Sequence, residues 1–197
     1  MRAASGFLRS EGVRIVTGHV HIDGRELTNN EPHRFARLGV SIVPEREKVF
    51  ARLTVTENLL SIGRLPSRDR RKDLFNFIHD LFPVLQERRN EIAGKLSGGQ
   101  RQMLALARGL LSDPRVLMID ELSLGLHESV QAPLFDAIKK ISETGTAVLL
   151  VDERMDFAMT MTDYCYVISD GAIIDQGRKG SLGATALFND VLEAEKL

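Results

Sequence analysis

A glycine-containing turn, Leu96-Ser97-Gly98-Gly99-Gln100, comes directly before a segment with helical periodicity. The first turn of a helix has free N–H groups and the positive end of the helix dipole, and both favour an anion. Glycines let a phosphate approach the backbone closely, and Ser97 adds a hydroxyl donor. The turn is therefore a candidate phosphate site. Taken alone, it is better interpreted as a serine that merely caps a helix, which is common.

Two carboxylates, Asp120 and Glu121, follow a short apolar run at 116–119. Open α/β sheets bind their ligands at the C-terminal ends of such strands. One carboxylate can hold Mg²⁺ bridged to phosphates, and the next can orient or deprotonate an attacking water. The alternative is that two acidic residues simply close a strand, which is unremarkable by itself.

The remaining pattern alternates between short apolar runs and amphipathic segments, which indicates an α/β fold with a buried, mostly parallel sheet. Pro83 is expected to kink or divide the second long helix. The whole chain, 1–197, is expected to form a single domain. The expected strands are 16–23, 40–43, 116–119, 147–151, 164–168 and 172–175, and the expected helices are 32–37, 54–65, 71–89, 98–112, 130–141, 157–161 and 187–196.

Composition narrows the possible functions. The chain has 26 Lys+Arg and 27 Asp+Glu, so nothing favours nucleic acid or anionic lipid as a partner. The only cysteine, Cys165, excludes an internal disulfide and a Cys-rich zinc site, and fits a reducing, cytosolic setting. No apolar run approaches the roughly 20 residues that span a bilayer. Any work at a membrane would require docking onto a partner that spans it.

Together, the glycine turn and the acidic strand end about twenty residues later resemble the signature and Walker B motifs of ABC ATPases. Residues 123–126 then resemble the D-loop of that family. Residues 43–45 and 54–59 resemble the region around its Q-loop, and 170–177 resemble its closing hairpin. The resemblance covers nearly the whole chain. It implies a P-loop NTPase-like ABC nucleotide-binding domain, with a helical subdomain at about 52–112.

Within this superfamily, the chain is most similar to the ATP-binding subunits of branched-chain amino-acid importers. The similar stretches are 34–40, 43–45, 81–83 and 88–90. Importers of urea and other amides share them. The resemblance implies an ATP-hydrolysing subunit that uses ATP and Mg²⁺ and pairs with a second ATP-binding subunit. It would act on transmembrane permease subunits at the cytoplasmic face of the inner membrane, without nucleic acid.

The resemblance also assigns roles to single residues. Asp120 would ligate Mg²⁺, and Glu121 would be the general base. The turn from Leu96 to Gln100 would contact the γ-phosphate of ATP held by the other subunit. Glu45 stands where the family usually has the Q-loop glutamine. Glu153 stands where it has the switch histidine, so it would add negative charge near the γ-phosphate.

The phosphate-gripping loop, Gly-x-x-x-x-Gly-Lys-Ser/Thr, is absent from the sequence. Gly94-Lys95 is the only Gly-Lys pair, but Leu96 follows it and Arg89 stands where the first glycine is required. The resemblance therefore implies an N-terminally truncated domain, without the strand that lies between the counterparts of 147–151 and 164–168. We expect marginal stability or dependence on a partner, because buried strand edges are costly when unpaired.

Two alternatives remain beside the importer ATPase. In the first, the chain is an inactive truncated remnant. In the second, it is a regulatory partner that supplies only the signature turn, 96–100, to ATP held by another subunit. A soluble ABC protein of translation or DNA repair is disfavoured, because only about fifty residues separate Glu45 from Leu96. Such proteins have paired domains, or they have a long coiled coil inserted between the Q-loop and the signature motif.

Overall fold

The structure is a computed structural model that describes residues 1–7, 12–45, 48–63, 65–122, 126–154, 158–159 and 161–178. The contacts within the chain divide it into two compact units, 1–151 and 152–197. Of the helix expected at 157–161, only 158, 159 and 161 are described. The helix expected at 187–196 lies outside the described residues.

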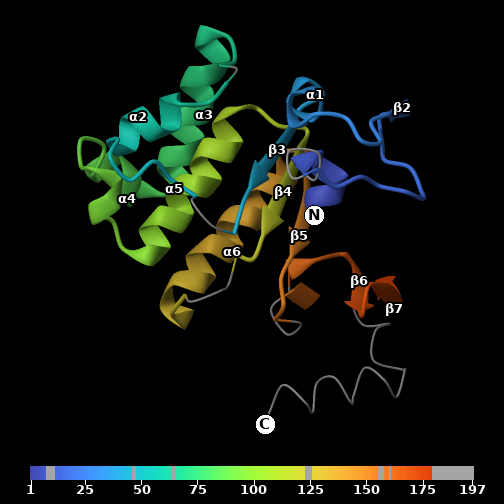
Figure 1. Cartoon of the computed structure of the whole chain (residues 1–197). Coiled ribbons are helices and arrows are strands. Elements are labelled where there is room, and N and C mark those ends of the chain that lie inside the picture. Colours follow the sequence, from blue (N-terminus) through green and yellow to red (C-terminus); the bar gives the residue numbers. More distant parts are fainter. Residues whose placement is uncertain are drawn as a thin grey trace. The chain divides into compact units, whose positions relative to one another are not determined.

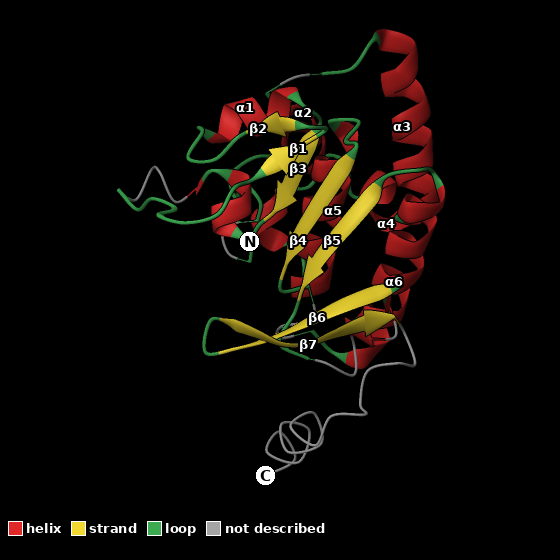
Figure 2. Ribbon diagram, turned by 90° about the vertical axis from the view of Figure 1, so that its right-hand side faces the viewer, coloured by secondary structure: helices red, strands yellow, loops and turns green. Residues whose placement is uncertain are grey.

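A parallel sheet of three strands forms the centre of the first unit (Figures 1 and 2). Its order is β3 (Val40–Val43), β4 (Val116–Asp120) and β5 (Ala147–Val151). These bounds agree with the expected strands to within one residue. The central strand β4 is the most buried, since it has a neighbour on both sides and helices over its faces. The expected α/β fold class is confirmed.

One face of this sheet is covered by α1 (Pro32–Arg37), which has its proline in the first turn as expected. Phe35 of α1 is only 2% exposed and anchors the helix to the strands. It belongs to a buried cluster in which alternate strand residues meet the helix and the preceding loop. The other members of that cluster are Leu27, Val40 and Met118.

The opposite face of the sheet meets α5 (Gly98–Leu111), which packs closely on β3. The approach is close because Gly109 has no side chain. A Cβ there would lie 3.1 Å from Leu117 Cδ1 and 3.2 Å from Val43 Cγ2. A second long helix, α6 (Glu128–Glu143), packs against β5.

Three further helices, α2 (Val55–Leu60), α3 (Arg68–Leu81) and α4 (Pro83–Glu87), pack against α5. The break between α3 and α4 falls at Pro83, as expected. Two expected boundaries were wrong. The first helix stops at Leu60, and α3 begins three residues early because the Ser67 side chain accepts the Arg70 N–H. The assignment of 52–112 as a subdomain stays a prediction.

Hydrogen bonds of Asn58 fix the entry to this helical segment. Asn58 is fully buried, and its Oδ1 accepts the Phe50 N–H at 2.8 Å. Its Nδ2 donates to the carbonyl oxygens of Phe50, Leu53 and Thr54. Thr54 also caps α2 through a reciprocal capping box with Glu57. A 3₁₀ turn at Ala93–Lys95 leads from α4 into α5.

The expected strand at 16–23 was largely wrong. After a 3₁₀ turn at Arg2–Ser5, the only strands in the described part of this region are β1 (His21–Ile22) and β2 (Arg25–Glu26). Gly18, with φ 86°, interrupts the extended backbone. The Asn29 side chain bonds both backbone groups of Ile15, in place of a partner strand.

The second unit contains an antiparallel hairpin of β6 (Tyr164–Ser169) and β7 (Ala172–Arg178). Asp170 and Gly171 form its turn, both with positive φ, as a two-residue hairpin turn requires. The expected hairpin is confirmed, and β7 runs three residues further than expected. Its exposed faces are rich in large apolar side chains: Tyr164, Tyr166, Ile168 and Ile173.

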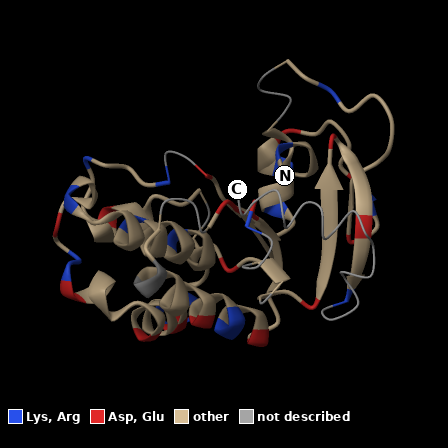
Figure 3. Cartoon of the chain, turned by 90° about the horizontal axis from the view of Figure 1, so that it is seen from below, with Lys and Arg blue, Asp and Glu red and all other residues tan. Residues whose placement is uncertain are grey.

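Charged residues of both signs are interspersed along the helices, as Figure 3 shows. This agrees with the near balance of charges in the sequence. No helix among the described residues combines the length and the hydrophobicity needed to cross a membrane.

Candidate functional site

The glycine turn forms the N-terminus of the 14-residue helix α5. The Gln100 N–H donates to Ser97 Oγ at 3.3 Å, and the Ser97 N–H donates to Gln100 Oε1 at 3.0 Å. Ser97 is thus a helix cap, as the simpler interpretation held. The cap uses Ser97 Oγ as an acceptor, so the hydroxyl proton remains available to a ligand.

The turn is anchored from two sides. The Leu96 side chain is only 2% exposed, and its carbonyl oxygen accepts a hydrogen bond from Arg101 Nη1 at 2.6 Å. Gly99 is buried against Val130 of α6, where a Cβ would lie 2.3 Å from Val130 Cγ1. Ser97 and Gly98 between these anchors are exposed. The surface of the turn therefore consists of Ser97 and Gly98, held in place by buried neighbours.

The carboxylates Glu45, Asp120 and Glu121 lie at one edge of the sheet. Parallel strands β3 and β4 pair Val43 with Ile119, so Glu45 and Glu121 each stand two residues beyond that pair. Asp120 is the last residue of β4, and all three are partly buried. The C-terminal ends of β3 and β4 thus carry Glu45 and the pair Asp120–Glu121, which belong to separate motifs of the sequence.

Glu121 has an unusual backbone. Its φ is 49°, in the left-handed region that residues other than glycine rarely adopt. Its N–H donates to the Val151 carbonyl at 2.8 Å, which ties the strained residue to the end of β5. Strain of this kind is often found where a side chain is held for function.

The turn and the acidic edge are connected through the start of α6. A Cβ on Gly98 would lie 4.0 Å from Leu126 Cδ2, and Gln131 Nε2 donates to the Leu126 carbonyl at 2.9 Å. Leu126 is five positions after Glu121 in the chain, so their Cα atoms are at most about 18 Å apart. The expected D-loop falls mostly on 123–125, which lie outside the described residues.

A buried polar contact joins α5 to the segment after Glu45. Lys48 Nζ donates to Oε1 of Gln102, whose side chain is 2% exposed and whose Nε2 has no hydrogen-bond partner in the described structure. Neither residue was predicted from the sequence. The available signal was that Gln102 stands four and eight positions before Leu106 and Leu110, on the buried stripe of the helix.

Glu153 belongs to the second unit and is exposed in a bend. The neighbouring Asp152 Oδ1 accepts the Arg154 N–H at 3.1 Å. The expected position of Glu153 beside the γ-phosphate stays a prediction. Among the described residues, no group of three or more His, Cys, Asp or Glu is placed to hold a metal, so Asp120 stands as a single carboxylate candidate.

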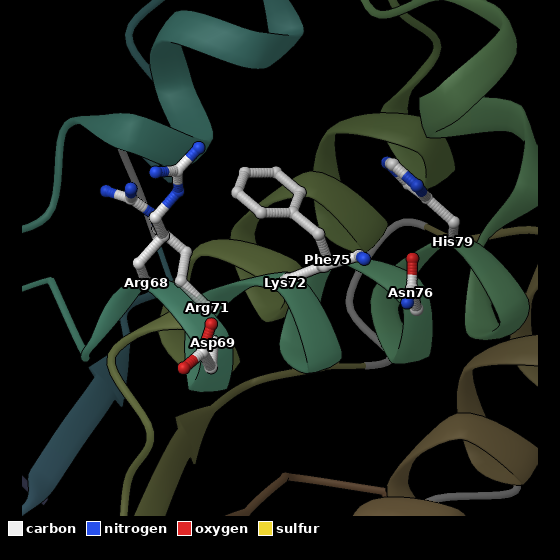
Figure 4. A pocket seen from close by; sticks show the side chains of 7 residues that line it. All are labelled: Arg68, Asp69, Arg71, Lys72, Phe75, Asn76 and His79. Carbon is white, nitrogen blue, oxygen red and sulfur yellow. The ribbon is translucent and has the colours of Figure 1, made fainter.

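A hollow of about 490 Å³ lies along α3 and is separate from this edge (Figure 4). Arg68, Arg71 and Lys72 line its first part. The Phe75 ring lies between the arginines and His79, with ring centroids 5.9 Å apart for Phe75 and His79. Burial lowers the pKa of His79, and Arg89 lowers it further, while Asp80 opposes them.

His79 should make the protein less stable in mild acid. Because its pKa is lowered by folding, its stabilising contribution is present above the unfolded pKa of about 6.5 and is lost as pH falls through the folded value. In His79→Gln, the free energy of unfolding should therefore fall less between pH 7 and pH 5. The difference should be roughly 0.5 kcal/mol, because solvent still screens this half-buried side chain. Urea titrations at both pH values measure it, with the exposed His33→Gln as control. If the free energy of unfolding falls equally between pH 7 and pH 5 in His79→Gln and in the wild type, the prediction is wrong.

Solved structures with this architecture are ATP-binding cassettes. The ADP conformation of an ATP-binding cassette of an ABC transporter matches 99% of this chain and 78% of its own, with a TM-score of 0.76 at 21% identity. A dimeric post-hydrolysis cassette bound to ADP and Pi matches 90% of this chain and 78% of its own, with a TM-score of 0.68 at 20% identity. The parallel sheet, its helices and their order thus define an ABC-type nucleotide-binding fold.

Sequence comparison gives the family itself. The family model described as ABC transporter matches residues 8–123. The high-affinity branched-chain amino acid transport ATP-binding protein BraG of Pseudomonas aeruginosa is 36% identical over 158 residues, which is 80% of this chain and 68% of BraG. A probable branched-chain amino acid transport ATP-binding protein, LivF of Archaeoglobus fulgidus, is 35% identical over 181 residues, 91% of this chain and 73% of LivF. The chain belongs to the ABC transporter family, as an ATP-binding subunit.

Proposed function

We propose that this chain is the ATP-hydrolysing subunit of an importer for branched-chain amino acids. It pairs with a second ATP-binding subunit and acts on transmembrane permease subunits at the cytoplasmic face of the inner membrane. The names of the relatives BraG and LivF support the substrate class. The dimeric post-hydrolysis cassette with the same fold supports the pairing.

One observation carries the proposal: Ser97 and Gly98 are exposed at the N-terminus of α5, while Leu96 and Gly99 are buried. An exposed helix N-terminus attracts phosphate through its free N–H groups and its dipole. The turn would therefore contact the terminal phosphate of ATP held by the other subunit. Gln100 supports the contact from within, because its side chain holds the cap.

The acidic edge supplies the groups for hydrolysis. Asp120 would ligate Mg²⁺, which commonly takes one or two carboxylates together with phosphates and waters. Glu121 would deprotonate or orient the attacking water. Glu45, at the same edge, would help to place that water and the metal. Glu153 would act near the γ-phosphate in place of a histidine.

ATP itself would be gripped by a phosphate-binding loop, which the sequence does not contain. The strand that leads into this loop would lie beside the outer edge of β5. Among the described strands β5 pairs only with β4, and its Leu149 and Val151 are 41% and 40% exposed. A parallel strand added there would cover these apolar side chains and pair the free edge.

The exposed turn is also compatible with a second candidate function. In that case the chain is a regulatory partner that presents only the signature turn to ATP on another subunit. Both candidates assign the same role to Ser97 and Gly98. They differ in whether this chain, once completed by a loop, turns over ATP at Glu121.

The signature turn is tested by mixing the chain with purified BraG and measuring phosphate release. The rate of ATP hydrolysis by the mixture should exceed the sum of the rates measured for the two proteins separately. Gly98→Asp should abolish the excess, because it puts a negative charge where the phosphate binds. It should leave the melting temperature unchanged, since position 98 is open and an acidic residue suits a helix N-terminus.

The matched control is Ser142→Asp, an exposed site that lies about 18 Å further along α6 than Val130 and adds the same charge, and it should keep the excess. No excess in the wild-type mixture would contradict the proposed function. Tight ATP binding by the chain alone would contradict the arrangement in trans.

A further inference from the structure

One face of α3 carries a stripe of charged, aromatic and amide side chains that has no role in the candidate nucleotide site (Figure 4). The side chains recur at three- and four-residue steps, which places them along one line of the helix. The stripe lines the hollow of about 490 Å³, a size typical of small-molecule sites. We call it the α3 hollow. The stripe consists of Arg68, Arg71, Lys72, Phe75, Asn76 and His79.

The cations of the α3 hollow are gathered at the start of the helix, where they destabilise it. Arg68, Arg71 and Lys72 all lie within its first five residues. Cations oppose the helix dipole at this end, and like charges three or four positions apart repel each other. This arrangement lowers the stability of the helix when nothing is bound. An anion bound at the start of α3 would relieve both costs.

These three cations lack anionic partners within the part of the chain that the structure describes. None of them makes an ion pair there, whereas Arg70 of the same helix pairs with Asp113 at 2.8 Å. The lining also contains one carboxylate, Asp69, which points away from the guanidinium groups of the two arginines (Figure 4). The start of the α3 hollow is therefore positive, and its charge is not neutralised by the described residues.

The other end of the α3 hollow suits a planar polar group. The partly buried Phe75 ring lies between the arginines and His79, and the centroids of the two rings are 5.9 Å apart (Figure 4). An aromatic ring open to solvent on one side offers a surface for stacking. The exposed Asn76 amide can both donate and accept hydrogen bonds, as the edge of a nucleobase requires. The eight positions from Arg71 to His79 span about 12 Å along the helix axis.

We propose that the α3 hollow binds a nucleoside monophosphate, with the phosphate at Arg68, Arg71 and Lys72 and the base against Phe75. A phosphate monoester carries close to two negative charges and three acceptor oxygens at neutral pH. It therefore suits two guanidinium forks and an ammonium better than a single carboxylate does. Side chains of one helix hold it without a glycine loop or a metal, so we expect a dissociation constant on the order of 0.1 mM. Binding would stabilise the start of α3.

The test uses the full chain at neutral pH without Mg²⁺ and compares three ligands by isothermal titration calorimetry. Adenosine 5′-monophosphate has both the phosphate and the base, ribose 5-phosphate lacks the base, and adenosine lacks the phosphate. Adenosine monophosphate should bind at least about tenfold more tightly than either fragment, because only it reaches both ends of the hollow. Added salt should weaken its binding, since Arg68 and Lys72 are exposed.

Two variants separate the two ends of the hollow. Arg71→Gln should weaken the binding of adenosine monophosphate at least about tenfold, because one guanidinium fork is lost. Phe75→Leu should reduce its affinity to that of ribose 5-phosphate, because leucine offers no ring for stacking. The matched control is Arg70→Gln, which removes the same charge from the same helix at a side chain already paired with Asp113. It should keep the affinity within about twofold.

The proposal is overturned if adenosine monophosphate does not bind, if the fragments bind as tightly as it does, or if Arg70→Gln weakens its binding as much as Arg71→Gln. None of the three ligands carries a γ-phosphate, and Mg²⁺ is left out, so the result does not depend on the acidic edge. A chain that binds adenosine monophosphate in this way but gives no excess hydrolysis with BraG would refute the proposed function and leave the α3 site standing.

Discussion

Glu121→Gln is expected to lower kcat for ATP hydrolysis by roughly 100-fold or more, while ATP affinity stays within about twofold of wild type. The variant is made in a chain extended at its N-terminus by a segment that contains the phosphate-binding loop Gly-x-x-x-x-Gly-Lys-Ser/Thr. Glutamine keeps the shape of glutamate but cannot accept the proton of the attacking water, and general-base catalysis contributes about 10²–10⁴ in rate. Steady-state phosphate release and equilibrium binding of a fluorescent ATP analogue measure the two quantities.

The geometry at the end of β4 indicates that Glu121→Gln changes the chemistry of the side chain without changing the backbone. The φ of 49° at Glu121 is imposed by the backbone, where its N–H bonds to Val151, and glutamine keeps that bond. Asp120→Asn is the companion variant and should instead raise the Mg²⁺ concentration needed for half-maximal hydrolysis. Retained turnover in Glu121→Gln would remove Glu121 from the role of base. An extended wild-type chain that binds ATP without hydrolysing it would favour the regulatory candidate.

The strands that position the site could be predicted because each depends on local features. β3 is a short apolar run stopped by Pro44, and β4 and β5 are continuous apolar runs, as expected for strands buried between helices. The start of α5 could be predicted for the same reason, since Ser97 and Gln100 form a capping box within four residues. Motifs of this length contain the information that fixes their own conformation.

The region before β1 could not be predicted from its alternation alone. A strand requires a partner, and here the side chain of Asn29 occupies the backbone groups of Ile15, fourteen residues away. Gly18 then takes a positive φ that ends the extended conformation. Alternating polarity indicates a half-buried segment, but it does not show whether a neighbouring strand or a side chain will satisfy the backbone.

The residues of the candidate site also differ in whether the sequence alone predicts them. Its motif residues were predicted, because the signature turn and the acidic strand end are each contiguous. Lys48 and Gln102 were missed, because their contact joins segments about fifty residues apart. Such contacts depend on tertiary packing, and a single sequence shows only that a polar residue stands on an apolar face.

Gly99→Ala is expected to destabilise the protein by about 2 kcal/mol, although alanine is the better helix former. A Cβ at this position would lie 2.3 Å from Val130 Cγ1 and 3.2 Å from Val130 Cβ, and a valine in a helix has little freedom to turn away. Overpacking of this kind costs about 1–3 kcal/mol, more than the roughly 1 kcal/mol that alanine gains over glycine within a helix. Urea denaturation followed by far-UV circular dichroism measures the change.

Two further variants separate packing from helix propensity. Gly98→Ala should change stability by less than about 0.5 kcal/mol, because a Cβ there meets only Leu126 Cδ2 at 4.0 Å. Val130→Ala should relieve the clash, so the double variant Gly99→Ala/Val130→Ala should show a favourable coupling of at least about 1 kcal/mol. If Gly99→Ala is as stable as Gly98→Ala, α5 and α6 are not packed as described. The exposed turn at Ser97 and Gly98 would then lose the anchor on which its phosphate-binding role depends.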